Sequence, residues 1–261
     1  MSGQDGAMDL GLRDKVYVVT GGTRGLGLAT AEALVADGAK VVISARDEDR
    51  VAASVEHLGG SRSALGLAGD LSDPELAPRL AAAASGMFGR IDGALVSVGG
   101  PPPGTPLSVD DEAWRGAFES VFLGAVRVTR AVAASLSDEG GSIAYVLSTS
   151  VKAPIEGLAT SNGLRPGLAM LAKDLADELG PRNIRVNSLL PGRIDTERVR
   201  ELDKSTGRAD ASRKRWSERI PLRRYGEPAE FGRVAAFILS PAASFLSGIA
   251  LAVDGGMTRS L

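Results

Sequence analysis

Cysteine is absent from this chain of 261 residues, and histidine occurs only once, at His57. Without cysteine the protein has no disulfides and no thiolate metal ligands. A single imidazole also argues against a metal centre built on histidine, so we predict that no metal is bound. Because Glu56 precedes His57 and two glycines follow soon after it, we expect this side chain on an exposed helix face.

An excess of charge of one sign is also missing, and so are long apolar runs. The formal net charge is −2, whereas a nucleic-acid-binding domain is usually strongly basic. The sequence has no run of about 18 apolar residues, as a membrane-spanning helix would need. Its N-terminus has no basic start followed by an apolar core. We therefore expect no nucleic-acid partner, no membrane contact, a cytoplasmic location and a flexible N-terminal tail over residues 1–12.

Aromatic residues make up only 4% of the chain, whereas glycine occurs 33 times. This balance suits a twisted sheet with tight strand-to-helix turns better than an aromatic-rich β-sandwich. Short β-rich apolar runs alternate along the chain with longer helical patterns. The expected strands are 16–19, 41–43, 65–68, 94–98, 143–147, 186–190 and 249–253, and the expected helices are 24–37, 47–57, 73–87, 110–138, 162–180 and 228–239.

This alternation of strands and helices predicts the fold class. Strands joined through helices imply right-handed crossovers and a parallel sheet that is covered on both faces. No change of composition divides the chain, and no internal repeat is visible. We therefore predict an α/β protein with a single Rossmann-like doubly wound domain over residues 13–261, built on a seven-stranded parallel sheet flanked by helices.

Residues 193–220 are highly charged and separate the last two expected strands. Ligands of open α/β sheets bind beyond the carboxyl ends of the strands, so a segment that leaves this edge fits a substrate lid. A solvated pair of surface helices is an equally good interpretation. Trp216, Ile220 and Leu222 are the apolar residues that could close on a ligand, or could contact another subunit.

Residues 20–27 form a glycine-rich turn between the first expected strand and the first expected helix. Gly21 permits the sharp turn, Gly25 lets the backbone approach a pyrophosphate, and Gly27 allows close helix packing. The helix N-terminus then offers unpaired N–H groups and the positive end of its dipole to phosphates. In this strand–turn–helix context the motif predicts a dinucleotide site. Its expected contacts are Gly21, Thr23, Arg24, Gly25, Leu26 and Gly27.

The end of the second strand indicates which dinucleotide is bound. An NAD enzyme places a carboxylate here to accept from the ribose 2′-hydroxyl, but this chain has Ala45 followed by Arg46. Arg24 and Arg46 can both bind a 2′-phosphate, which predicts NADP(H) in preference to NAD(H). Asp47 is a competing partner for Arg46. Asp70 is expected at the adenine edge, or as a cap on the helix that follows it.

With these motifs the chain resembles the short-chain dehydrogenase/reductase family over nearly its whole length. Gly69-Asp70-Leu71 is similar to the adenine-contact segment of the family. Residues 191–196, Pro191-Gly192-Arg193-Ile194-Asp195-Thr196, are similar to the Pro-Gly-x-x-x-Thr element that holds the carboxamide of the cofactor. The C-terminal elements 220–222, 226–228 and 253–256 also match. Within the family the chain looks most like 3-oxoacyl-[acyl-carrier-protein] reductases.

This resemblance implies the strand order 3-2-1-4-5-6-7 and a homotetramer or homodimer. It implies a small carbonyl substrate, with an acyl thioester as one option. It also implies cofactor contacts beyond the glycine turn, namely Leu71, Gly99, Arg165, Pro191, Gly192, Ile194 and Thr196.

The resemblance is weaker at the positions that carry the chemistry, where the family has Asn, Ser, Tyr and Lys. The serine position falls on Ser148, but the asparagine position holds Val121, the tyrosine position Ser161 and the lysine position Arg165. The apolar pattern of the downstream helix keeps the register. The proline-rich loop 99–104 and this Ser-Asn-x-x-Arg segment resemble a divergent subgroup of the family.

These replacements bear on the proton that a carbonyl reduction needs. Ser161 is a far poorer acid than a tyrosine, and Arg165 stays charged and does not relay a proton. Arg165 can nevertheless stabilise negative charge. Three functions stay open: an NADP-dependent oxidoreductase using Ser148, Ser161 and Arg165, a non-redox cyclase or isomerase in which Asn162 is a further hydrogen-bond donor, and a catalytically silent NADP-binding protein.

Four other residues are candidate proton donors. Tyr17 is expected in the core. Strand alternation points Tyr145 away from Ser148. Tyr225 lies near the cofactor edge, at a position that is usually apolar in the family. Lys152 either reaches the site from its loop or is a solvated surface lysine.

Overall fold

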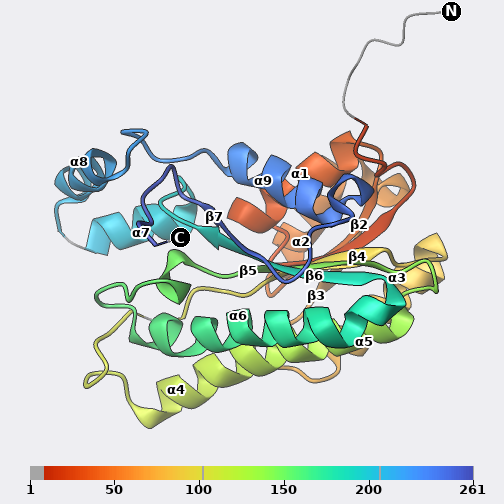
Figure 1. Ribbon diagram of the computed structural model, residues 1–261, viewed down its shortest axis with the longest axis horizontal. Helices are drawn as coiled ribbons and strands as arrows, with labels where there is room; N and C mark the ends of the chain where they lie inside the picture. Colours follow the sequence, from red (N-terminus) through yellow and green to blue (C-terminus); the bar gives the residue numbers. More distant parts are fainter. Residues whose placement is uncertain (1–8, 102, 206, 261) are drawn as a thin grey trace, which may run out of the picture.

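The computed structural model describes residues 9–101, 103–205 and 207–260 (Figure 1). Its seven strands form one sheet in the order β3-β2-β1-β4-β5-β6-β7, and every neighbouring pair is parallel. The strands are β1 (Val16–Thr20), β2 (Lys40–Ala45), β3 (Ala64–Ala68), β4 (Gly93–Ser97), β5 (Gly141–Val146), β6 (Ile184–Pro191) and β7 (Ala250–Val253). The predicted fold class and strand order are confirmed.

The helices cover both faces of this sheet. They are α1 (Gly25–Ala36), α2 (Glu48–His57), α3 (Leu76–Phe88), α4 (Asp111–Ala117), α5 (Gly124–Ser135), α6 (Ala159–Leu179), α7 (Glu197–Ser205), α8 (Ala209–Arg219) and α9 (Pro228–Leu239). Figure 1 shows α1 and α9 on one side of the sheet and α5 and α6 on the other. Successive strand residues alternate between the faces, so Val18 packs into one core and Val19 into the other.

Two helix predictions need correction. The helix expected over 110–138 ends at Ser135 and is interrupted, because Phe118–Leu123 is π-helical between α4 and α5. The helix expected from residue 73 begins at Leu76, because hydrogen-bonded turns precede it. In these turns the Asp70 carboxylate accepts from the Ser72 backbone at 2.9 Å, and the Asp73 carboxylate accepts from the Glu75 backbone at 2.9 Å. Such local side-chain bonds compete with helix formation.

Most of the predicted N-terminal tail, residues 1–8, lies outside the described part of the chain. Of the rest, Leu12 is buried in the core beside α1 and α9. Packing of the domain therefore begins before residue 13. Within the described ranges, no helix has both the length and the apolar character that crossing a membrane requires.

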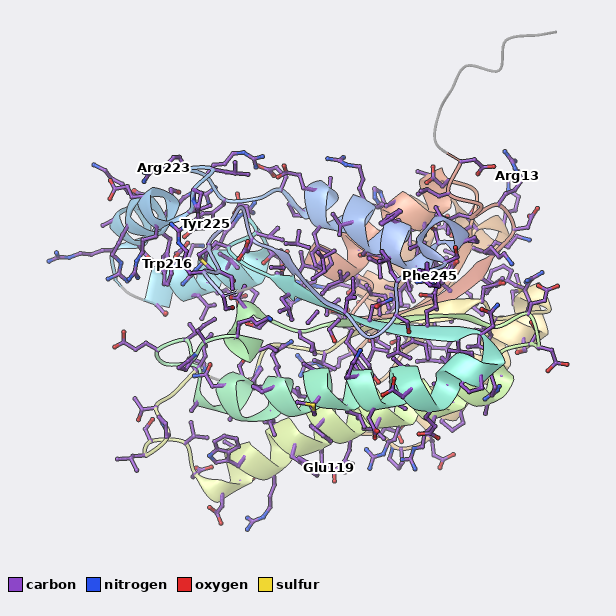
Figure 2. The ribbon with its side chains drawn as sticks, in the orientation of Figure 1. Arg13, Glu119, Trp216, Arg223, Tyr225 and Phe245 are labelled. Carbon is purple, nitrogen blue, oxygen red and sulfur yellow. The ribbon has the colours of Figure 1, made fainter. Side chains whose placement is uncertain are left out.

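The charged segment 193–220 contains the two helices α7 and α8, which lie beyond the carboxyl end of β6 (Figure 1). The three apolar residues singled out at its end, Trp216, Ile220 and Leu222, differ in burial. Ile220 is buried, Trp216 is half-buried, and Leu222 is 63% exposed. Trp216 belongs to α8 and is labelled in Figure 2. The Arg193 guanidinium is stacked on its ring, 4.1 Å from the ring centroid. Of the three, only Trp216 lines the cavity described below.

Candidate active site

A cavity of about 2210 Å³ opens at the carboxyl ends of the central strands. Its wall is built from the glycine turn, the end of β2, the loop after β4, the segment after β5, α6, the segment after β6, and the helices α7 and α8. The cavity thus follows the general rule for ligand sites of open α/β sheets. All the predicted cofactor contacts line it: Gly21, Thr23, Arg24, Gly25, Leu26, Gly27, Arg46, Asp70, Leu71, Gly99, Arg165, Pro191, Gly192, Ile194 and Thr196.

The glycine turn has the geometry of a phosphate cradle. Gly21 (φ +61) and Gly25 (φ +54) adopt left-handed conformations that favour glycine. A Cβ atom on Gly27 would collide with the Gly21 carbonyl. Arg24 is the N-cap residue of α1 but makes no side-chain capping bond, and the first turn of α1 has no acidic residue. The first N–H groups of α1 therefore remain available to an anion.

The cations near this cradle are paired with carboxylates. Arg24 Nη1 lies 3.1 Å from Glu197 of α7, and Arg50 Nη1 lies 3.7 Å from the same carboxylate. Arg46 Nη1 lies 3.9 Å from Asp70. The sequence did not single out Arg50 or Glu197 as site residues, because only the fold brings α2 and α7 together.

The alternatives considered for Asp47 and Asp70 are wrong. Asp47 is the N-cap of α2, where its carboxylate accepts from the Arg50 backbone, and it pairs with the Arg50 side chain at 3.4 Å. The carboxylate that pairs with Arg46 is therefore Asp70 and not Asp47. Asp70 accepts from the backbone and hydroxyl of Ser72 and closes a turn ahead of α3. It is not the cap of that helix, whose N-cap residue is Glu75.

Ser148 and Ser161 reach the cavity from two different elements. Ser148 follows β5, and its Oγ accepts from the backbone of Ser150 at 3.0 Å. Ser161 lies in the first turn of α6, where it is buried, and its Oγ is 3.3 Å from the Oγ of Ser150. Ser150 therefore links the two serines, through its backbone N–H to Ser148 and through its hydroxyl to Ser161. Ser150 could not be selected from the sequence, because hydroxyl residues are common in this segment.

Arg165 is 6% exposed and lies one turn further along α6 than Ser161. It donates to the carbonyls of Val146 (2.9 Å), Leu147 (2.7 Å) and Gly99 (3.3 Å). Burial, together with the charge of Arg198, lowers the pKa of Arg165 to about 10. The guanidinium therefore remains charged at neutral pH and places a cation at the carboxyl ends of β4 and β5.

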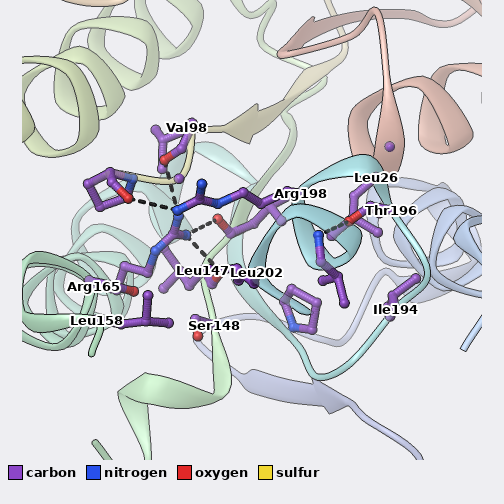
Figure 3. Close-up of a pocket in the computed structure, with 18 of the residues that line it drawn as sticks. Leu26, Val98, Leu147, Ser148, Leu158, Arg165, Ile194, Thr196, Arg198 and Leu202 are labelled. Carbon is purple, nitrogen blue, oxygen red and sulfur yellow. Dashed lines mark hydrogen bonds between the residues drawn. The ribbon is translucent and has the colours of Figure 1, made fainter. Parts of the chain in front are cut away.

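Arg198 extends from α7 to the loop after β4. Its Nη2 donates to the carbonyl of Pro101 at 2.9 Å, and its Nη1 lies 3.8 Å from Glu201 (Figure 3). A Cβ on Gly100 would lie 2.8 Å from Arg198 Nε, so a side chain there would push Arg198 away. The sequence did not identify Arg198, since nothing separates it from the other arginines of the charged segment.

The three tyrosines and Asn162, which the sequence offered as further donors, form hydrogen bonds with other parts of the protein. Tyr17 donates to the carbonyl of Leu239, and Tyr145 bonds with Thr129 in the core, where burial raises the pKa of Tyr145 to about 12. Tyr225 donates to Asp203 at 3.0 Å; burial and this bond raise its pKa to about 12. Asn162 bonds to the backbone of Ile155 through both amide atoms.

Among the described residues, no tyrosine lines the cavity. Lys152 lines it and is exposed. The buried Val121 also lines it, from the π-helical segment. His57 is exposed, as expected, and pairs with Glu32 at 2.7 Å. In the described ranges, no three His, Asp or Glu side chains are grouped so that they could hold a metal ion.

Comparisons with known proteins agree with this architecture. The family model described as enoyl-(acyl carrier protein) reductase matches residues 21–258. An uncharacterized oxidoreductase of Mycobacterium tuberculosis is 36% identical over 251 residues, or 95% of this chain and 93% of its own. Human dehydrogenase/reductase SDR family member 4 is 34% identical over 249 residues, or 94% and 88% of the two chains.

Solved structures agree as well. The crystal structure of L-sorbose reductase from Gluconobacter frateurii, complexed with NADPH and L-sorbose, superimposes with a TM-score of 0.92 at 30% identity, over 97% of this chain and 100% of that one. The family match thus covers most of the chain, and the relatives exceed 30% identity over nearly its full length. The chain belongs to the short-chain dehydrogenase/reductase family of oxidoreductases.

Proposed function

We propose that this protein is an NADP(H)-dependent reductase of a small carbonyl substrate. In this proposal Ser148, Ser161 and Arg165 surround the reacting carbonyl in place of the tyrosine and lysine of the family. The observation that carries the proposal is that one continuous cavity joins the glycine turn to these three side chains. The structural relative L-sorbose reductase, which was crystallised with NADPH and L-sorbose, supports the same class of reaction.

The preference for NADP(H) rests on the charges around the end of β2. Ala45 supplies no carboxylate there, while Arg24, Arg46 and Arg50 all line the cavity. Their present partners, Glu197 and Asp70, are carboxylates that a 2′-phosphate would replace. Guanidinium groups bind phosphate oxygens in bidentate geometry, so these three arginines fit the extra phosphate.

The chain's own groups would act on the carbonyl oxygen. When bound, the nicotinamide supplies the hydride that forms the new C–H bond, as the carbonyl π electrons move to oxygen. The fixed charge of Arg165 would stabilise the negative charge that develops there. Ser148 and Ser161 would hydrogen-bond the same oxygen, and Ser161 or water would deliver its proton. Loss of a good general acid costs about 10²–10⁴-fold in rate, so we expect slow turnover.

A second candidate follows from the absence of a cavity-lining tyrosine among the described residues. An enzyme that binds NADP(H) without oxidising or reducing its substrate, or a silent NADP-binding protein, would need the cradle but no proton donor. In either case the two serines and Arg165 would only hold a ligand.

We also propose a homotetramer or homodimer. The α4–α6 side exposes Met170 (72%) and Phe118, which is stacked on Phe122 at 5.3 Å between ring centroids. Along β7, Leu251 is partly exposed, and Phe245 just before the strand is fully exposed (Figure 2). Exposed apolar patches of this kind are typical of subunit contacts.

The test of the function combines cofactor binding with turnover. NADPH and NADH are titrated against the purified protein, and NADPH oxidation is then followed with ketones and 3-oxoacyl thioesters. We expect tighter binding of NADPH and slow, substrate-dependent oxidation. The double variant Ser161→Tyr, Arg165→Lys should be faster with the same substrate. Tight NADPH binding with no oxidation by either protein would contradict the reductase and favour the second candidate.

A further inference from the structure

We propose that the carbonyl substrate is an oxo acid and that Arg198 on α7 binds its carboxylate. The inference rests on the proposed function and deepens it, because it names the class of substrate and a residue that determines specificity.

The first observation is the charge balance around Arg165. Its guanidinium is almost fully buried, and its three partners are neutral backbone carbonyls. Among the described residues, no carboxylate forms an ion pair with it. Burying a charge is costly unless it is well paired. Carbonyl dipoles offset part of this cost, but the wall of the cavity keeps a net positive charge.

The second observation is that Arg198 adds another positive charge to the same place. It is close enough to contribute to the lowered pKa of Arg165, and both side chains donate to the Gly99–Pro101 backbone (Figure 3). Its acidic neighbour Glu201 is 3.8 Å away and 57% exposed, and an exposed pair of this kind contributes little. Like charges at close range repel in a shielded cavity, so an anion between them would lower the energy of the site.

The third observation is how the two guanidinium groups are placed relative to the serines. Ser161 and Arg165 are one turn apart on α6, and Ser148 follows β5. Arg198 comes from α7, on a different wall of the cavity. A small molecule whose carbonyl faces the serines can therefore direct a second polar group towards Arg198. A carboxylate fits a guanidinium best, because the two groups form parallel charge-assisted hydrogen bonds.

The phosphates of the cofactor do not fill this role in our proposal. The phosphate cradle lies at the N-terminus of α1, and the arginines beside it are Arg24, Arg46 and Arg50. Arg198 instead contacts the loop after β4, next to Arg165. In the proposal, the guanidinium of Arg198 is therefore available to bind the carboxylate of the substrate.

A simpler role for Arg198 is to clamp the Gly99–Pro101 loop through its bond to the Pro101 carbonyl. The two roles differ in a measurable way. Loss of a loop clamp would impair acidic and neutral substrates equally, whereas loss of a carboxylate partner would impair only the acids.

The experiment compares acids with their neutral esters on the full-length protein. The probes are pyruvate, acetoacetate and levulinate, which differ in the distance between carbonyl and carboxylate, each paired with its methyl ester. NADPH oxidation gives kcat/KM for wild type, Arg198→Met and Arg198→Lys. Calorimetry on the NADP⁺ complex gives the affinity of each acid and ester without any turnover. Lys204→Met is the control, because it removes one positive charge from the exposed surface of the same helix.

We expect at least one acid to be preferred over its ester by wild type. Arg198→Met should lower kcat/KM and affinity for that acid about 10- to 100-fold, the range for loss of a charge-assisted bond, and should leave the ester nearly unchanged. Arg198→Lys should keep part of the preference, and Lys204→Met all of it. Equal losses for acid and ester, or a wild-type protein that binds none of the acids, would overturn the inference.

The design separates this inference from the reductase activity. Binding of an acid that depends on Arg198, without NADPH oxidation, would support the carboxylate site and contradict the reductase. Equal rates of NADPH oxidation with ester and acid would support the reductase and contradict the carboxylate site. If Arg198→Met does not fold, Arg198→Lys and the wild-type comparison of acid with ester still decide the question.

Discussion

Glu197 and Arg198 are consecutive residues of α7, yet their side chains contact different parts of the cavity wall. Glu197 pairs with Arg24 of the glycine turn at 3.1 Å, whereas Arg198 donates to Pro101 in the loop after β4 at 2.9 Å. Neighbouring side chains of a helix point about 100° apart. One turn of α7 can therefore contact both the glycine turn and the loop after β4. The position of α7 is therefore tied both to the glycine turn and to the loop after β4.

The pairing of Glu197 predicts the effect of removing its charge. Glu197→Gln frees Arg24 and Arg50 from the carboxylate that, in the proposed NADP(H) site, would compete with the 2′-phosphate. We expect NADPH to bind about two- to fivefold more tightly, as suits exposed ion pairs, with little change for NADH. Fluorescence titration of NADPH measures this. Glu201→Gln, on the same helix, is the control. Unchanged or weaker NADPH binding would show that Glu197 does not compete with the phosphate.

Arg46 provides the complementary test of cofactor choice. Its side chain is 77% exposed and lies near Asp70 at the end of β3. Arg46→Ala should weaken NADPH binding about 10-fold or more, because a hydrogen bond to a charged group is lost, and should spare NADH. Titration of both cofactors at low and high salt measures the effect and its electrostatic origin. A variant that weakens NADPH and NADH equally would argue against a 2′-phosphate contact.

Arg165 should matter both to stability and to rate. Arg165→Met leaves three backbone carbonyls without their donor, and we expect a loss of about 1–3 kcal/mol in the free energy of unfolding. Urea unfolding measures this loss. Reductase activity should fall about 10²-fold or more, since the charge near the carbonyl oxygen is removed. Arg165→Lys should recover part of the activity. A stable Arg165→Met variant with full activity would contradict both roles.

Asp195 connects the segment after β6 to both α7 and α8, and its pKa depends on them. Hydrogen bonds from Arg213 (3.0 Å) and Arg200 (2.8 Å) lower the pKa of Asp195 to about 2. A carboxyl whose pKa is lower when folded contributes stability above its unfolded pKa, and this stability is lost as pH falls through the folded value.

Wild type should therefore exceed Asp195→Asn in unfolding free energy by a constant amount from pH 7 down to about 5. The difference should shrink as the pH falls from about 4 towards about 2. Urea unfolding of both proteins across this range is the measurement. A difference that stays constant down to pH 3 would mean that the two arginines do not hold Asp195 ionised.

Local patterns were enough to predict the sheet and the cofactor cradle. Val16–Thr20 and its neighbours have the continuous apolar runs of doubly covered strands, and the glycines at 21, 25 and 27 are required by a turn between adjacent elements. Both signals lie within a few residues of the structure they specify. Ser148 and Ser161 were predicted differently, from the resemblance of their positions to those of the family's serine and tyrosine.

The contacts made by the charged segment could not be predicted in this way. Four arginines of this segment have similar sequence surroundings but different contacts. Arg193 contacts Trp216 and Asp203, and Arg198 contacts Pro101. Arg200 contacts Asp195, and Arg213 contacts both Asp195 and Tyr225. Apolar periodicity tells which face of a helix is buried, but α7 and α8 are mostly polar. Only the packing of α7 against distant loops decides which arginine enters the cavity.

The π-helical segment Phe118–Leu123 widens one turn of the helix that joins α4 to α5, because π-helical bonds run from residue i to i+5. Such a turn takes up one residue more than an α-helical turn, so deletion of one residue there would leave α4 and α5 in phase as a regular α-helix. Val128 and Val132 would keep their places in the core, whereas Val121, which lines the cavity, would shift. Single-residue deletions in this segment should therefore change the cavity more than the stability of the fold.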